Sequence, residues 1–96
     1  MKELIEKLNK SKSYRLVSKV AEAIYQDSLS TCEAAWSEDI EDDDGRVGYI
    51  MEDIESYYVG EEIISDDLWS TEVKAPNGNM ISVRDLVFEE VMGGVS

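Results

Sequence analysis

The stretch VGYIMEDIESYY, residues 47–58, gives the clearest helix prediction in this chain, because its apolar residues recur at helical spacing. The apolar face of the predicted helix is formed by Val47, Ile50, Met51, Ile54, Tyr57 and Tyr58. At roughly 100° per residue, Glu52 and Asp53 point away from that face. Gly60 is the expected stop of the helix. The stretch therefore predicts a helix that packs on a core and turns carboxylates outward.

Two more helices are predicted in the first 25 residues. Residues 1–10 have apolar side chains at helical spacing, namely Leu4, Ile5 and Leu8. After a polar break, Ser11 or Ser13 is expected to cap a second helix that runs to about Tyr25. The apolar positions of this second helix are Tyr14, Val17, Val20, Ala21 and Ile24.

The segment SLSTCEAAWSEDI, residues 28–40, predicts a third helix, with Ser28 or Ser30 as its cap. Its buried stripe is expected to consist of Cys32, Ala35, Trp36 and Ile40. The acidic run EDDDG follows at residues 41–45. We expect this run to be a solvated loop in which Gly45 makes the turn.

After residue 60 the sequence predicts shorter elements, including a β-hairpin. EEIISDDLW, residues 61–69, is expected to form a short helix or turn that buries Ile63, Ile64, Leu68 and Trp69. Two β-prone runs then flank Pro76-Asn77-Gly78, and Asn-Gly is a strong hairpin signal. Ser82 and Asp85 resemble a capping box that opens a final helix over residues 84–92. We expect Gly93 and Gly94 to end this helix, and we expect its buried residues to be Leu86, Val87 and Val91.

These elements predict a mainly α fold of the α+β class, a small single-domain helical bundle with one short β-hairpin near the C-terminus. A length of 96 residues favours one domain, spanning residues 1–96. Within it, residues 1–25 form net-basic helices, residues 26–72 form a strongly acidic helical region, and residues 73–96 form the hairpin and the final helix.

Charge is unevenly distributed along the chain, whose formal net charge is −13. Residues 1–25 carry a net charge of +3. Residues 26–72 contain sixteen carboxylates and a single cation, Arg46, which gives a net charge of −15. So much negative charge opposes binding to nucleic acid and to anionic membranes, and it favours a basic partner.

The residue inventory gives no sign of an enzyme or of a cofactor. The sequence has no histidine, no G-x-S-x-G motif and no phosphate-binding glycine loop. Its one cysteine, Cys32, stands beside Glu33 in acidic surroundings that discourage a thiolate, so we expect a buried structural role. No signal peptide and no transmembrane run is evident, and we expect a cytoplasmic protein.

The acidic run also raises the question of a calcium site. If Gly45 occupies position 6 of an EF-hand loop, Asp42 and Asp44 occupy positions 3 and 5. Positions 1 and 12 are then Ile40 and Met51, so the first ligand and the bidentate carboxylate are missing. We therefore expect no metal site beyond weak association of divalent cations, and a metal-binding domain ranks third among the hypotheses.

Two acidic stretches carry a resemblance at the level of a class. SEDIEDDDGRVGYIMEDIESYY, residues 37–58, and EEIISDDLWS, residues 61–70, resemble small acidic bacteriophage proteins of the antirestriction and anti-CRISPR type. Those proteins mimic DNA and inhibit restriction enzymes, CRISPR effectors, nucleases or nucleoid proteins. The resemblance is compositional and covers residues 27–72, whereas the net-positive first 25 residues and the hairpin depart from a uniformly acidic mimic.

The resemblance implies a non-catalytic inhibitor, in the cytoplasm of the host cell, that occupies the nucleic-acid-binding site of a host defence or DNA-processing protein. Fifteen negative charges correspond to roughly 26 Å of duplex DNA. The predicted partner-binding residues are Glu38, Asp39, Glu41, Asp42, Asp43, Asp44, Glu52, Asp53, Glu55, Glu61, Glu62, Asp66 and Asp67.

A second hypothesis is an acidic protein–protein interaction module, of the adaptor or antitoxin kind, that binds through an apolar helix face. Tyr49 and Phe88 lie off the buried stripes of their helices, so we expect both to be exposed and Phe88 to be a contact. A homodimer is compatible with so small a core.

Overall fold

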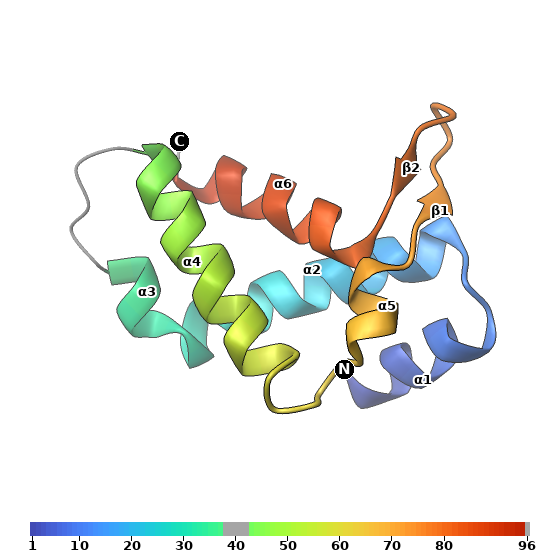
Figure 1. Ribbon diagram of the computed structural model, residues 1–96, viewed down its shortest axis with the longest axis horizontal. Coiled ribbons are helices and arrows are strands. Elements are labelled where there is room, and N and C mark those ends of the chain that lie inside the picture. Colours follow the sequence, from blue (N-terminus) through green and yellow to red (C-terminus); the bar gives the residue numbers. More distant parts are fainter. Residues whose placement is uncertain (38–42, 96) are drawn as a thin grey trace.

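The computed structural model describes residues 1–37 and 43–95, and it describes their side chains except those of Ser37, Asp43 and Asp44. Over these residues the chain forms six helices and one two-stranded antiparallel hairpin, which confirms the predicted mainly α class (Figure 1). The elements are α1 (Lys2–Lys10), α2 (Tyr14–Thr31), α3 (Glu33–Ser37), α4 (Asp43–Tyr58), α5 (Asp66–Ser70), β1 (Val73–Lys74), β2 (Met80–Ile81) and α6 (Val83–Val95).

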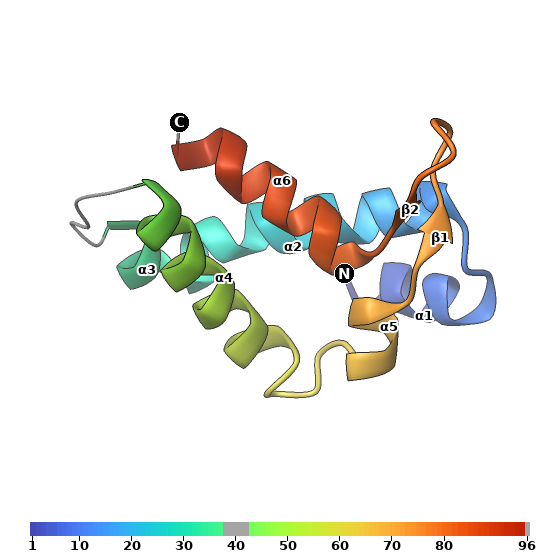
Figure 2. The ribbon, with the colours of Figure 1, turned by 45° about the horizontal axis from the view of Figure 1, so that its top comes forward.

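Helix α6 holds the fold together, because it packs against α2, α4 and α5. Helix α1 packs against α2, and the short helix α3 lies between the end of α2 and α4. The hairpin projects away from the helices in both ribbon views (Figures 1 and 2). The largest fully buried side chains come from most of these elements and include Leu8, Ile24, Ile54, Tyr58, Trp69 and Val87. None of the described helices is long and apolar enough to span a lipid bilayer.

Helix α2 begins as predicted and ends later than predicted. The Ser13 hydroxyl accepts a hydrogen bond from the Leu16 amide, which is the expected cap. The helix then continues past Tyr25 to Thr31. Ser28 is buried inside it and donates its hydroxyl to the Tyr25 carbonyl, so it does not cap a new helix. The prediction that Ser28 or Ser30 starts a third helix is therefore wrong.

Helix α3 is shorter than the predicted third helix. It covers five residues and follows directly on Cys32. Cys32 and Ala35 are buried as predicted, while Trp36 is half-buried and packs edge-on against the Tyr25 ring. The predicted contribution of Ile40 lies outside the described residues.

The start of α4 corrects the prediction of an acidic loop. The helix already includes Asp43, so Gly45 lies within its first turn and makes no loop turn. Arg46 then donates from its guanidinium to the Trp36 carbonyl and ties α4 to α3. Glu41 and Asp42, the other acidic residues of the predicted loop, lie outside the described residues.

The two sides of α4 are close to the prediction. Its buried residues are Val47, Ile50, Met51, Ile54 and Tyr58. Glu52 and Asp53 are exposed, as the helical spacing required. The exception is Tyr57, which stays 39% exposed at the edge of the stripe.

The turn between α4 and α5 depends on Gly60. Helix α4 ends at Tyr58, close to the predicted stop. A β-carbon at Gly60 would collide with the Ser56 carbonyl group, so the chain needs glycine where it leaves the helix. Glu62 then adopts a φ of 59°, a left-handed conformation that is rare for residues with a side chain. After this reversal only Ile64 reaches the core, and Ile63, which was predicted to be buried, is 39% exposed. Leu68 and Trp69 of α5 are buried as predicted.

The hairpin forms where Asn-Gly predicted it. Val73 pairs with Ile81, and Lys74 pairs with Met80. Between the strands, Gly78 has a φ of 89°, which glycine adopts without strain.

Helix α6 opens with the predicted capping box and runs further than predicted. The Ser82 hydroxyl accepts from the Asp85 amide, and the Asp85 carboxylate accepts from the Ser82 amide. Gly93 and Gly94 lie inside the helix, so the prediction that they end it is wrong. The physical reason lies at Gly94, where an added β-carbon would be 2.6 Å from the Tyr25 hydroxyl and 3.3 Å from the Trp36 ring. The missing side chain lets the end of α6 pack closely on α2 and α3.

Candidate protein-binding surface

The predicted partner-binding residues fall into three groups in the structure. Glu38, Asp39, Glu41 and Asp42 lie outside the described residues, and Asp43 and Asp44 occupy the first turn of α4. The remaining seven are all exposed. We call these seven the acidic surface, and they are Glu52, Asp53, Glu55, Glu61, Glu62, Asp66 and Asp67.

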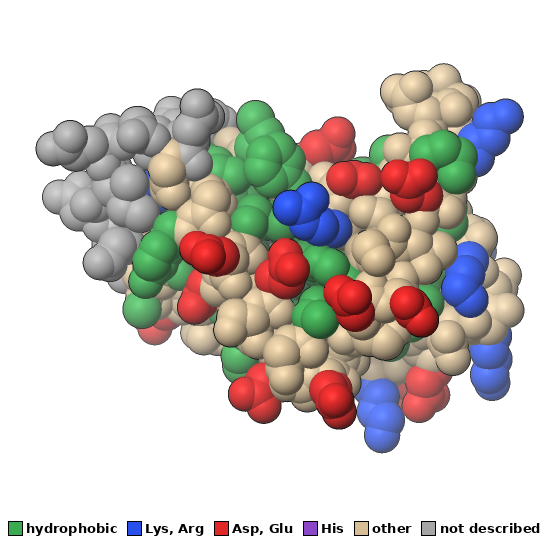
Figure 3. All heavy atoms as spheres, viewed as in Figure 1, with side chains coloured by type: hydrophobic (Ala, Val, Ile, Leu, Met, Phe, Trp, Pro, Cys, Tyr) green, Lys and Arg blue, Asp and Glu red, His purple; other side chains and the backbone are tan. Residues whose placement is uncertain are grey.

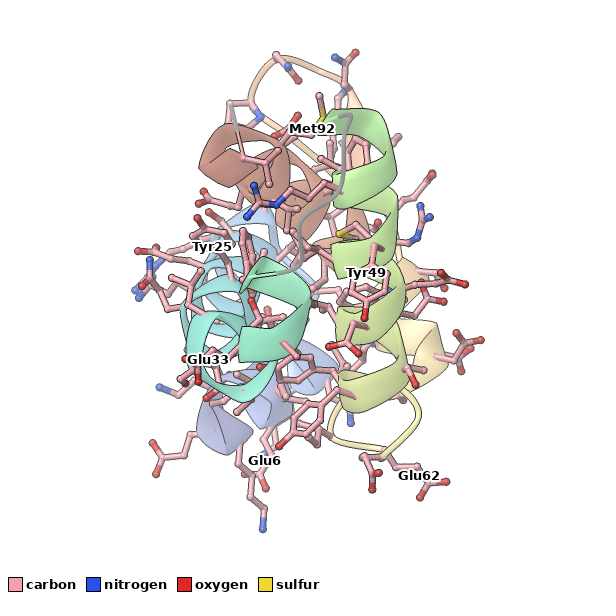
Figure 4. All side chains as sticks on the ribbon, turned by 90° about the vertical axis from the view of Figure 1, so that its left-hand side faces the viewer. Glu6, Tyr25, Glu33, Tyr49, Glu62 and Met92 are labelled. Atoms are coloured by element: carbon pink, nitrogen blue, oxygen red, sulfur yellow. The ribbon has the colours of Figure 1, made fainter. Side chains whose placement is uncertain are left out.

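Helix α4 brings three of these carboxylates together on its outward side. Glu52 and Asp53 border a shallow depression that also includes Tyr49 and Ser56. Glu52 and Glu55 border a second one beside it, above the turn at Gly60. Tyr49 projects from α4 into solvent, as predicted (Figure 4). The result is an anionic surface along α4, with two shallow depressions and an exposed tyrosine.

Other parts of the fold use some of these carboxylates locally. The Glu55 carboxylate lies 3.7 Å from the Arg84 Nε, and this is the one ion pair among the described residues. Asp66 and Asp67 stand in the first turn of α5, where the helix dipole favours negative charge. Glu52, Asp53, Glu61 and Glu62 have no cationic side chain within ion-pair distance in the described part of the chain. Because Asp53 also interacts with the Cys32 thiol, Glu52, Glu61 and Glu62 are the most available of these four to a partner's cations.

Positive charge gathers elsewhere on the molecule. In Figure 3 most of the Lys and Arg side chains in view lie toward the right-hand and lower margins, near α1, the start of α2 and the hairpin. Asp and Glu side chains spread over the middle of the same view, which α4 crosses in Figure 1. This separation agrees with the net charge of +3 on residues 1–25 and −15 on residues 26–72.

A buried polar network joins α2 to the inner side of α4. The fully buried Tyr58 hydroxyl donates to the Asp27 carboxylate and lies 3.3 Å from the Thr31 hydroxyl. Burial, together with this bond to Asp27, raises the pKa of Tyr58 above its ordinary value. Burial also raises the pKa of the Cys32 thiol to about 11, and Asp53 contributes in the same direction. Cys32 is therefore a protonated, buried thiol at neutral pH, which fits a structural role.

A second surface was only partly visible in the sequence. Three exposed apolar side chains, Met80, Phe88 and Met92, gather where the hairpin meets α6, and they are 52%, 40% and 46% exposed. The open groove between the two elements, which we call the notch, is lined by Asn79, Met80, Ile81, Asp85, Phe88, Glu89 and Met92. The sequence predicted the exposure of Phe88 and missed both methionines. The spacing of Phe88 and Met92, four residues apart and off the buried valine stripe, was the available signal.

No group of three or more metal-ligating side chains is clustered within the described residues. The described residues form two candidate binding surfaces. The acidic surface is anionic, and the notch is apolar with an acidic rim. Comparison of the chain with protein-family models, with curated proteins and with solved structures finds no match.

Proposed function

We propose that this protein is a non-catalytic inhibitor that occupies the nucleic-acid-binding surface of a basic protein, of the host-defence or DNA-processing kind. The observation that carries the proposal is the exposure of all seven carboxylates of the acidic surface, of which only Glu55 has an ion-pair partner among the described residues. Lys and Arg side chains of the target would pair with these carboxylates as they pair with phosphates.

The amount of charge supports this mechanism. The net charge of −15 on residues 26–72 equals the charge of roughly 26 Å of duplex DNA. The longest dimension of the molecule is 39 Å. The charge per unit length is therefore of the same order as that of the duplex, and a channel built for DNA would meet a comparable potential.

The energetics of the free protein point the same way. Like charges held on one folded region repel each other and destabilise the compact state. Cationic side chains of the protein offset only part of this repulsion. Glu52, Asp53, Glu61 and Glu62 are exposed and have no cation within ion-pair distance in the described residues. A cationic partner would remove the repulsion, so binding and stabilisation are expected together.

The test begins with a tagged pull-down from nuclease-treated bacterial lysate at about 50 and about 500 mM salt, with the bound proteins identified by mass spectrometry. We expect a nucleic-acid-binding protein that is retained at low salt, is lost at high salt and is displaced by duplex DNA. A partner that survives high salt and ignores DNA would contradict the mechanism.

Matched variants then locate the contact. Glu52→Lys together with Asp53→Lys should weaken binding to the captured target, and so should charge reversal across residues 41–44. The control is Glu6→Lys together with Glu22→Lys, which changes the net charge as much as the α4 double variant does, at exposed positions outside the acidic surface. Equal weakening by the two double variants would show that net charge matters and that this surface does not.

A second candidate function is an acidic interaction module that binds through an apolar helix face. The observation that favours it is the exposure of Phe88 and Met92 on α6. This function predicts weak salt dependence and a large loss of binding on substitution of Phe88. The salt series above separates it from DNA mimicry.

A further inference from the structure

Helix α6 has more apolar side chains than the core buries. Val83, Val87 and Val91 form its buried side, four residues apart. Phe88 and Met92, also four residues apart, lie on another side and remain exposed. In a helix that only closes a core, that side is expected to carry polar residues. An exposed phenylalanine flanked by methionines is instead typical of an interface.

The second wall of the notch is formed by β2, whose outer side is an edge of the two-stranded sheet. The lining residues come from 79–81, which include β2, and from α6, whereas β1 contributes none. In Figure 1, β2 lies on the side of the hairpin that faces α6, and the space-filling view in Figure 3 is hollowed there. Since the sheet has two strands within the described residues, the outer edge of β2 has backbone groups that face away from β1.

The two strands differ in how their edges are protected. Lys74 belongs to β1 and Pro76 follows it closely, and lysine and proline are residues with which natural proteins block an edge. The strand β2 consists of Met80 and Ile81, which offer no such protection. The unprotected edge is thus the one beside the exposed side of α6.

The negative charge that lines the notch favours a cationic occupant. Its lining includes Asp85 and Glu89 and neither lysine nor arginine. Asp85 is held by the capping box, while Glu89 is exposed. A second copy docked by a two-fold axis would place the same carboxylates face to face, on molecules that each carry a net charge of −13. A cationic segment meets no such repulsion.

We propose that the notch binds an extended, basic segment of a partner protein, which pairs with the outer edge of β2 and places apolar side chains on Phe88 and Met92. The backbone of β2 would supply the pairing, and the apolar side of α6 would supply the anchor. The proposal is independent of the acidic surface, because no residue is shared between the two surfaces.

The probe for this site is a short synthetic peptide of alternating lysine and valine, added to the full-length, isotopically labelled protein and followed by amide NMR. We expect saturable shifts at residues 79–81 and along the exposed side of α6, with slower hydrogen exchange in β2. A lysine–serine peptide tests charge alone, and a glutamate–valine peptide tests apolarity alone. Both should bind at least about tenfold more weakly.

Substitutions supply the matched control. Phe88→Ala and Met92→Ala should each weaken the lysine–valine peptide by about tenfold. Leu29→Ala removes a side chain that is 41% exposed, close to the 40% of Phe88, at a position on α2 outside the notch, and it should leave binding unchanged. Glu52→Lys with Asp53→Lys should leave the shifts at residues 79–81 in place.

Three results would overturn the proposal. The first is a set of shifts that fall on the acidic surface and leave the notch unaffected. The second is equal binding by the lysine–serine peptide, or no loss in Phe88→Ala. The third is a change at residues 79–92 that depends on protein concentration without any peptide, since a second copy would then be the occupant.

Discussion

Helices α4 and α6 pack against each other and bury similar apolar stripes, yet α6 also exposes an apolar pair that has no counterpart on the acidic side of α4. The outward side of α4 carries Glu52 and Asp53 with Tyr49 between carboxylates, and the outward side of α6 carries Phe88 and Met92. Because the shared core constrains only the buried sides, the outward sides are free to differ. The two binding proposals rest on this difference.

The largest effect should come from breaking the shared core. Ile54→Ala removes a side chain of α4 that is fully buried, and we expect a loss of about 2–5 kcal/mol in the free energy of unfolding. Met92→Ala on the outward side of α6 should cost less than about 1 kcal/mol. Urea denaturation measures both values. Similar costs for the two variants would mean that Met92 belongs to the core.

The two adjacent glycines of α6 test the same contrast within one helix. Gly94→Ala forces a β-carbon against Tyr25 and Trp36, and we expect it to cost about 1–3 kcal/mol. Gly93→Ala meets no atom within 4 Å, and alanine favours a helix, so we expect a gain of up to about 1 kcal/mol. Thermal or urea denaturation of the pair gives the sign directly. A destabilised Gly93→Ala would show that α6 does not continue as a helix through this position.

Alkaline pH should reveal the polar network that joins α2 to α4. The pKa of Cys32 rises from 9.0 to about 11 in the folded protein, so the folded state holds the proton more tightly than the unfolded state. Stability is then complete below pH 9 and falls as the pH rises toward 11, by at most about 1.4 kcal/mol per pH unit for one proton.

Cys32→Ala should flatten this decline, as measured by urea denaturation between about pH 8 and about pH 10.5. The remaining slope above pH 10 would belong in part to Tyr58, whose pKa is also raised by burial. An unchanged slope in the variant would mean that Cys32 does not contribute.

The smallest effect is expected from the ion pair between Glu55 of α4 and Arg84 of α6. Arg84→Gln removes the partner of Glu55, but both side chains are about half exposed, so we expect a loss of at most about 1 kcal/mol that disappears at high salt. Arg15→Gln is the control, since it removes one exposed positive charge that has no ion pair within the described residues. A larger, salt-independent loss in Arg84→Gln would point to packing of the arginine stem.

Features whose cause lies within about four residues were predictable from the sequence. The cap at Ser13, the capping box at Ser82 and the turn at Gly78 each depend on a local hydrogen bond or a local backbone conformation. The buried stripe of α4 follows from helical periodicity in the same way. These predictions required no knowledge of the neighbouring elements.

The errors came from packing between distant segments. Ser28 looks like a cap in the sequence, but the site in which it is buried turns its hydroxyl back to Tyr25. Gly94 looks like a helix stop, but it is the point where α6 approaches Tyr25 and Trp36. The notch has the same origin, since the angle between hairpin and helix brings Met80 beside Phe88 and Met92. The exposure of Glu52 and Asp53 was predicted correctly from helical spacing, and the role of the seven described carboxylates in binding stays a prediction.

The central place of α6 has a consequence for how the protein is made. Helix α2, whose buried side includes Val17, Val20 and Ile24, packs against α6, which is the last of the described elements to be synthesised. Until then the emerging chain exposes apolar surface, which promotes aggregation. The acidic middle is synthesised before α6, so we expect the repulsion between its carboxylates to oppose aggregation of unfinished chains. The same carboxylates would thus protect the protein during its synthesis and recognise a partner after folding.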